Sequence, residues 1–68
     1  MNEDALNRTV RKFLKTVGVT SQREIEIAIR NAVADGRLKG DETLAARATV
    51  TLGSVDLNVQ IDGEIDLE

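Results

Sequence analysis

The sequence contains no cysteine, histidine or tyrosine, and its only aromatic side chain is Phe13. Without cysteine, no disulfide can cross-link the chain, and a structural zinc site lacks both of its usual ligand types. The residue types that most often act as catalytic base or nucleophile are missing too. One aromatic ring is no platform on which bases or sugars could stack. These absences argue against an enzyme, and they predict neither a cofactor nor a bound metal.

Two serines and four carboxylates are the remaining candidates for chemistry. Ser21 is placed to cap a helix and Ser54 to form a turn, and neither lies in a nucleophile-elbow motif. Alternate acidic residues along one strand stand at steps of about 7 Å and offer oxygen ligands to a hard cation, but their spacing matches no calcium loop. We interpret this row as an acidic outer face, consisting of Asp56, Asp62, Glu64 and Asp66.

The length of 68 residues predicts one small domain over residues 1–68. A domain of this size buries only about 60% of the surface of its unfolded chain, so small unlinked domains often gain stability by oligomerising. No apolar run approaches the roughly 20 residues of a membrane span. The polar start Met1-Asn2-Glu3-Asp4 is unlike a signal peptide. We therefore expect a soluble cytoplasmic protein that makes no membrane contact.

The net charge of −3 is unevenly distributed. Residues 1–40 hold eight basic and five acidic side chains, whereas residues 41–68 hold one basic and seven acidic side chains. A basic part and an acidic part can steer association with a partner or a second copy, or attract each other within the fold. We interpret them as solvated faces with modest internal attraction.

The N-terminal half predicts two helices. Asn2 is a good N-cap for a helix over about residues 3–17, which Gly18 would end in a left-handed conformation. Ser21 and Glu24 have the spacing of a capping box and predict a second helix over about residues 21–35, closed by Gly36. The expected inner stripes are Leu6, Val10, Phe13, Leu14 and Val17 in the first helix, and Ile25, Ala28, Ile29, Ala32 and Val33 in the second.

The segment from Gly36 to Thr43 contains two glycines and raises the question of a phosphate-binding loop. It lacks the Gly-Lys-Ser/Thr ending of a P-loop, and it follows a helix where a phosphate cradle would precede one. We interpret it as the connection to the C-terminal hairpin.

Strict alternation of apolar and polar residues predicts that hairpin, with strands over about residues 44–52 and 55–67. A two-residue type II′ turn at Gly53-Ser54 would pair Leu52 with Val55 and Leu44 with Gly63. Asp62-Gly63 is a second turn signal, but a reversal there would put Ile65 and Leu67 on the wrong face. One continuous strand, with Gly63 marking a bulge or a close backbone approach, avoids that conflict.

The expected fold class is therefore α+β, with two N-terminal helices followed by the hairpin (ααββ) and packed on one face of it. In the expected register, Ile65 and Leu67 run beyond the first strand and lack a cross-strand apolar neighbour. A lone two-stranded sheet is marginal in water, and its exposed edges invite strand addition. We therefore expect a homodimer in which the second strands meet or the helices of one copy cover the hairpin of the other. The expected partner surface includes Ile65, Leu67 and Ile27, an isoleucine off the inner stripe.

Five segments of the chain can be compared with known families: Asn2-Glu3-Asp4, Arg11-Lys12-Phe13-Leu14-Lys15, the stretch from Val17 to Glu26, Leu38-Lys39-Gly40 and Asp62-Gly63-Glu64-Ile65. Together they resemble a family of short bacterial proteins with no assigned function. The resemblance covers nearly the whole chain and implies a complete protein, but it implies no catalytic or binding residues. Leu67-Glu68 fits either a native end or the remnant of a purification tag.

The predicted second helix and hairpin are also similar to the recognition helix and wing of winged-helix DNA-binding proteins. The residues that would reach bases or phosphates are Gln22, Arg23, Arg30, Arg37 and Lys39. An acidic wing would repel phosphates, however, and such domains usually place a further helix before this pair. The sequence thus favours a non-enzymatic protein-interaction or assembly module that binds itself or another protein, with nucleic-acid binding as the alternative.

Overall fold

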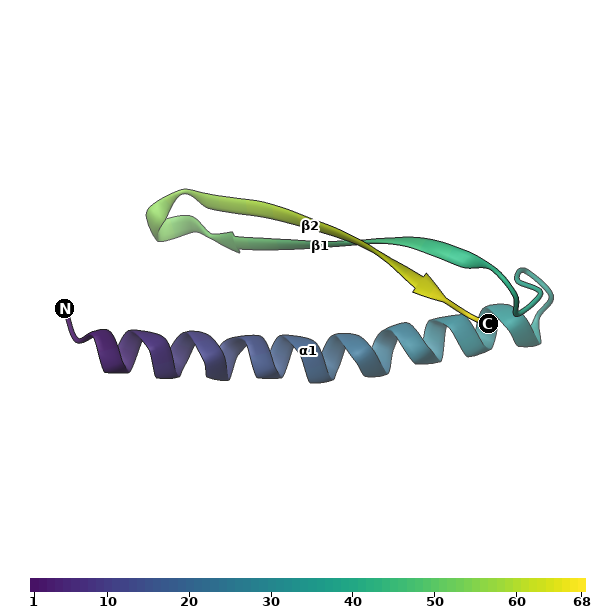
Figure 1. Cartoon of the computed structure of the whole chain (residues 1–68), viewed down its shortest axis with the longest axis horizontal. Helices are drawn as coiled ribbons and strands as arrows, with labels where there is room; N and C mark the ends of the chain where they lie inside the picture. The colour runs from purple at the N-terminus through teal and green to yellow at the C-terminus, as the bar shows by residue number, and fades with distance from the viewer. The chain divides into compact units, whose positions relative to one another are not determined.

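The computed structural model describes residues Met1–Glu68, and Figure 1 shows one long helix followed by an antiparallel hairpin. Helix α1 spans Glu3–Ala34, strand β1 spans Thr43–Leu52 and strand β2 spans Leu57–Asp66, with a short 3₁₀ turn, η1, at Gly53–Val55. The chain divides into two compact units, a helical unit Met1–Arg37 and a hairpin unit Leu38–Glu68. The chain is α+β, but the expected order of two helices before the hairpin is wrong.

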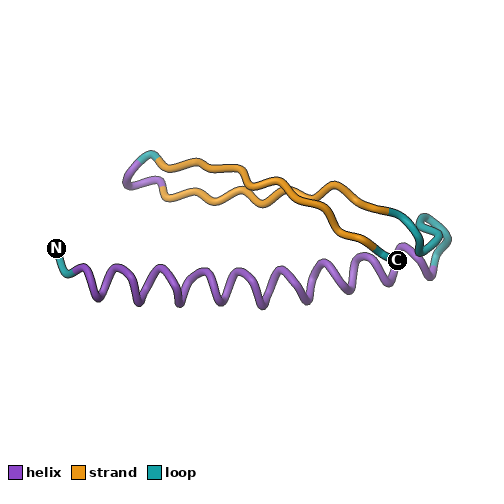
Figure 2. The backbone as a smooth tube through the Cα atoms, in the orientation of Figure 1, coloured by secondary structure: helices purple, strands orange, loops and turns teal.

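The helix continues through the segment 18–20 that was expected to link two helices, as the unbroken coil in Figure 2 shows. Gly18 does not have a positive φ and so is not a left-handed helix stop. Glycine inside a helix costs about 1 kcal/mol relative to alanine, whereas a break would leave four N–H and four C=O groups without intrahelical partners. No proline forces such a break. The expected capping box at Ser21 and Glu24 therefore lies inside α1.

Both outer ends of the helical region were predicted correctly. The Asn2 side chain accepts a hydrogen bond of 3.0 Å from the Ala5 N–H, and Glu3 and Asp4 follow in the first turn. At the other end Gly36 adopts a φ of 85°, the left-handed conformation that ends many helices.

The hairpin has one apolar and one polar face, as the alternation predicts, but its register differs from the expected one by two residues. Leu52 lies opposite Leu57, and Ile65 lies opposite Leu44. Leu67 also has a partner, because its N–H bonds to the Glu42 carbonyl at 3.0 Å. The expectation that Ile65 overhangs the first strand is wrong, whereas Leu67 does lie beyond β1, opposite Glu42. The argument for a dimer drawn from the overhang therefore fails for Ile65.

The turn explains the changed register. Four residues, Gly53 to Asp56, connect the strands in place of the expected Gly53-Ser54 pair. Gly53 does not have a positive φ, whereas Asp56 adopts the left-handed conformation with φ 55° and ψ 31°. The β2 strand passes through Asp62-Gly63 without a second reversal, as predicted. The expected bulge at Gly63 is absent, because each residue of β2 has a single partner on β1.

Very little of this chain is buried. Ala32, at 8% exposed, is the only buried residue, and no polar side chain is buried. A single helix has no interior of its own, and a two-stranded sheet has apolar side chains on only one side. Neither unit can therefore form a hydrophobic core from its own residues.

Candidate functional site

The first candidate surface is the α1 stripe, a row of side chains that recur every three or four residues along one side of the helix. The row is unbroken because Val17, Ser21 and Ile25 are each four residues apart, so the two stripes expected for separate helices are in phase. Its most prominent side chain, Phe13, is 55% exposed. The α1 stripe consists of Leu6, Val10, Phe13, Val17, Ser21, Ile25, Ala28 and Ala32. The other members of the two expected stripes, Leu14, Ile29 and Val33, flank this row.

The second candidate surface is the apolar face of the hairpin. Its residues form five directly opposed pairs in the observed register, four of them between side chains, because Gly63 has none. Ile61 in β2 is 57% exposed, and Val59 beside it is 39% exposed. The face is made by Leu44, Ala46, Ala48, Val50 and Leu52 in β1, and by Leu57, Val59, Ile61, Gly63 and Ile65 in β2.

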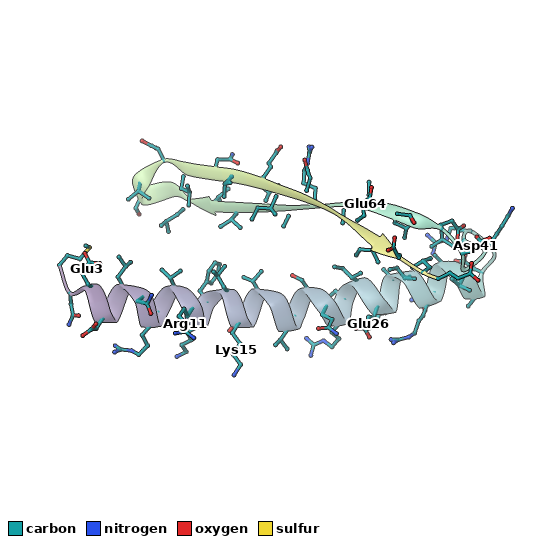
Figure 3. The ribbon with its side chains drawn as sticks, in the orientation of Figure 1. Glu3, Arg11, Lys15, Glu26, Asp41 and Glu64 are labelled. Carbon is teal, nitrogen blue, oxygen red and sulfur yellow. The ribbon has the colours of Figure 1, made fainter.

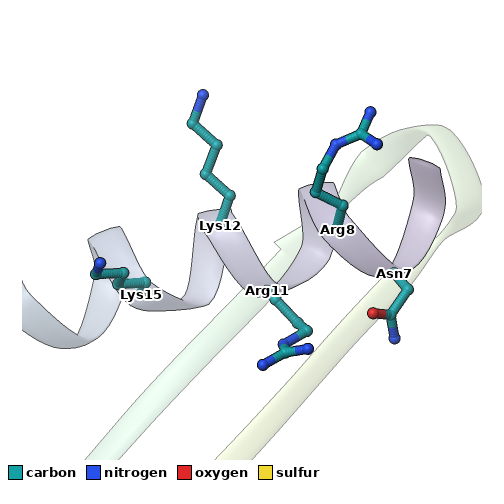
Figure 4. A pocket seen from close by; sticks show the side chains of 5 residues that line it. All are labelled: Asn7, Arg8, Arg11, Lys12 and Lys15. Carbon is teal, nitrogen blue, oxygen red and sulfur yellow. The ribbon is translucent and has the colours of Figure 1, made fainter. Parts of the chain in front are cut away.

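A third feature, the basic cluster, lies in the N-terminal half of α1. At about 100° per residue its four side chains fall on the side of the helix opposite the α1 stripe. Figure 4 shows them lining a shallow depression together with Asn7 and extending away from the helix. None takes part in an ion pair, and no acidic residue lies between Asp4 and Glu24. The basic cluster consists of Arg8, Arg11, Lys12 and Lys15.

Sequence reasoning missed the basic cluster as a site. The spacing of three, four and seven residues from Arg8 puts all four charges on neighbouring turns of one helix face, where like charges repel. In Figure 3 the labelled Arg11 and Lys15 side chains leave α1 on the same side. The spacing was visible in the sequence, and it was interpreted only as the solvated side of a helix.

The residues predicted to contact nucleic acid are mostly engaged with neighbouring side chains. Gln22 and Arg30 each donate a hydrogen bond of 2.9 Å to the Glu26 carboxylate. Both bonds lower the pKa of Glu26, and the bond from Gln22 has the larger effect. Arg37 bonds to Asp35 at 2.9 Å and lowers the pKa of that carboxyl group. The winged-helix interpretation is wrong in its architecture, since residues 21–34 continue the helix that begins at Glu3.

Two other predicted nucleic-acid contacts, Arg23 and Lys39, make no ion pair. They belong to different units, with Arg23 in α1 and Lys39 in the loop before β1.

The predicted partner surface does not form one patch within either unit. Ile27 is on α1, off the α1 stripe, and is 45% exposed. Ile65 belongs to the hairpin apolar face, and Leu67 follows the end of β2. Whether any of the three contacts a partner stays a prediction.

In the loop from Gly36 to Thr43, which was considered as a phosphate site, the backbone N–H groups bind a carboxylate of the same loop. The Glu42 carboxylate accepts N–H bonds of 2.9 Å from Lys39 and Gly40, and a longer one of 3.2 Å from Asp41. The bonds from Lys39 and then Gly40 are the main reason that the pKa of Glu42 is lowered. The donors that a phosphate would need are therefore occupied.

Side chains of β1 bond to two acidic residues of the hairpin, and one of these side chains, Arg47, is a cation. Asp62 accepts a bidentate pair from Arg47, and Asp66 accepts a hydrogen bond of 2.9 Å from the Thr43 hydroxyl. The Arg47 pKa is raised by its bond to Asp62. The structure contains no group of three side chains placed to hold a metal ion.

These features define a small α+β protein with one long amphipathic helix and one two-faced hairpin. The chain belongs to a family of unknown function (DUF6494), whose model matches residues 1–68. The expected resemblance to a family without an assigned function is confirmed. No curated protein and no solved structure shows significant similarity to the chain. None of its helices combines the length and apolar character of a membrane span, and the cytoplasmic location stays a prediction.

Proposed function

We propose that this protein is a non-enzymatic assembly module that associates with a second copy of itself. The observation that carries the proposal is the presence of an apolar face on each unit together with a single buried side chain, Ala32. Completing the burial of a half-exposed valine, leucine or phenylalanine is worth about 1 kcal/mol. Eight large apolar side chains on the two faces are 39–57% exposed, and together they supply a strong drive towards association.

The chemistry of the chain supports a binding role over a catalytic one. Histidine, cysteine and tyrosine are absent, Ser21 lies inside α1, and Ser54 lies in the turn between the strands. The most basic and most acidic surfaces consist of exposed side chains on regular elements. Such surfaces hold partners by complementary charge and do not enclose a substrate.

Sedimentation equilibrium over a hundredfold range of protein concentration tests self-association. We expect the mean mass to rise above that of the 7.4 kDa chain as the concentration increases. A mass that stays at 7.4 kDa up to millimolar concentration would show that each chain covers its own apolar faces, and the proposal would fail.

A second candidate function, polyanion binding, is favoured by one observation, the four unpaired cations of the basic cluster on one side of α1. Contacts from Lys and Arg to phosphates release counterions, so the affinity for duplex DNA would fall steeply with salt. Replacing Arg11 and Lys12 by glutamine would reduce the slope of the logarithm of affinity against the logarithm of salt concentration by about 2. The same change at Arg23 and Arg30 is the matched control. A titration against mixed duplex DNA that shows no binding at low salt excludes this function.

A further inference from the structure

We propose that two copies of α1 pair antiparallel along the α1 stripe, around a twofold axis at the level of Val19. This inference rests on the proposed self-association and names the surface that carries it. Among the exposed faces of the molecule, the α1 stripe is the one in which the spacing of the apolar residues matches a second copy of itself in a defined direction.

The spacing of the α1 stripe is the same in both directions. From Leu6 to Ala32 the steps are four, three, four, four, four, three and four residues. A second copy running the other way therefore presents its apolar positions at the same heights. The resulting pairs are Leu6 with Ala32, Val10 with Ala28, Phe13 with Ile25, and Val17 with Ser21.

Side-chain size favours the antiparallel direction. In three of these four pairs a larger side chain meets a smaller one, so the distance between the helices stays nearly even along the contact. A parallel pair would set Phe13 against Phe13 and Ala28 against Ala28, which crowds one end and leaves a gap at the other. Crowding and cavities in an interface each cost stability.

Charge favours the same direction. The N-terminal half of α1 carries the basic cluster and no acidic residue from Ala5 to Gly18. The segment Thr20–Ala34 is balanced, with Arg23 and Arg30 against Glu24 and Glu26. Parallel helices would put the two basic clusters at the same level on the outer sides of the pair, whereas antiparallel helices put each cluster level with the neutral half of the partner. Antiparallel helix dipoles attract as well.

The stripe is long and follows a nearly straight helix. Leu6 and Ala32 are separated by about 39 Å at 1.5 Å per residue. Leu6, Val17 and Ala28 follow one another at intervals of eleven residues, a period that keeps an apolar seam straight or gives it a slight right-handed twist. Ala32 is already buried in the single chain, so the part of the contact in which both paired residues are accessible runs from Val10 to Ala28.

Spin labels on exposed asparagines test the direction without altering the stripe. Asn7 and Asn31 are both exposed, and the chain has no cysteine to compete for the label. In the antiparallel pair, two copies of Asn7→Cys are offset by about 36 Å along the axis, whereas Asn7→Cys and Asn31→Cys on different chains lie at the same height. For Asn7→Cys alone we expect a distance between the two spin labels above about 35 Å. For a mixture of Asn7→Cys and Asn31→Cys chains we expect an additional population with a label-to-label distance below about 25 Å. The reverse order would overturn the proposal.

A matched pair of valines tests the surface. Val10 lies on the α1 stripe and Val59 on the hairpin apolar face, and they are 45% and 39% exposed. We expect Val10→Asp to weaken association more than tenfold and Val59→Asp to change it less than threefold. Val10→Ala, which raises helix propensity, should still weaken association, because it removes apolar surface from the stripe. Dissociation by Val59→Asp alone would overturn the helix pairing and leave self-association standing, whereas a wild-type chain that stays monomeric would remove both.

Discussion

Arg47 on β1 lies directly opposite Asp62 on β2, with its Nε 2.6 Å from Oδ1 and its Nη2 3.2 Å from Oδ2. The pair is on the polar face of the hairpin and forms a two-pronged contact that suits the flat guanidinium group. In the register expected from a two-residue turn, Arg47 would have faced Gln60, and Asp62 would have faced Ala45. The ion pair therefore belongs to the observed register alone.

A charge-reversal cycle tests this register. Arg47→Asp and Asp62→Arg should each destabilise the protein slightly, and the double variant should recover most of the loss, because opposite charges again face each other across the strands. Both side chains are more than half exposed, so the effect is small. The measurement is the free energy of unfolding at low salt. Additive effects with no coupling would contradict the pairing.

Replacing Gly18 distinguishes one helix from two. Gly18 has no positive φ, and an added Cβ would meet no atom within 4 Å. Gly18→Ala should therefore stabilise the protein by about 0.5–1 kcal/mol. Gly36→Ala is the control and should destabilise it by about 1 kcal/mol, because Gly36 has a φ of 85°. Thermal unfolding followed by circular dichroism at 222 nm measures both, and a destabilising Gly18→Ala would support a helix end at that position.

The conformation of the hairpin turn predicts that substitution of Asp56 affects stability and that substitution of Gly53 does not. Asp56 holds the left-handed conformation, so Asp56→Val should destabilise the hairpin by about 1 kcal/mol, whereas Asp56→Gly should be neutral or stabilising. Gly53→Ala should have little effect, because Gly53 lacks a positive φ. Amide exchange across the β1 and β2 ladder reports the outcome. Strong destabilisation by Gly53→Ala would favour the two-residue turn.

The Glu42 carboxylate should make the loop before β1 sensitive to acid. Because its pKa in the folded protein is below the ordinary value of 4.5, Glu42 contributes stability that is present above pH 4.5 and lost as the pH falls through the lowered pKa. Exchange of the Lys39 and Gly40 amide protons should accelerate over that range relative to amides in the middle of α1. In Glu42→Gln the neutral amide is a weaker acceptor, and these protons should exchange faster at neutral pH. Unchanged protection in that variant would contradict the role of the carboxylate.

Much of the fold follows from local pattern. Asn2, Gly36 and the alternation of Leu44 to Leu52 and Leu57 to Ile65 marked a helix start, a helix end and two strands with one apolar face each. The prediction failed at Gly18, because glycine is compatible both with a helix interior and with a helix stop. The phase that Val17 keeps with Ser21 and Ile25 was the available sign that one helix continues.

The sequence alone determined which side of each element is apolar, because that depends only on the period of the pattern along the chain. It could not determine the hairpin register, since a shift of two residues leaves every side chain on the same face. The four-residue turn ending at Asp56, and with it the pairing of Arg47 with Asp62, was decided only in the folded structure. There the geometry of the turn and contacts between residues far apart in the chain select one register among those that the alternation allows equally.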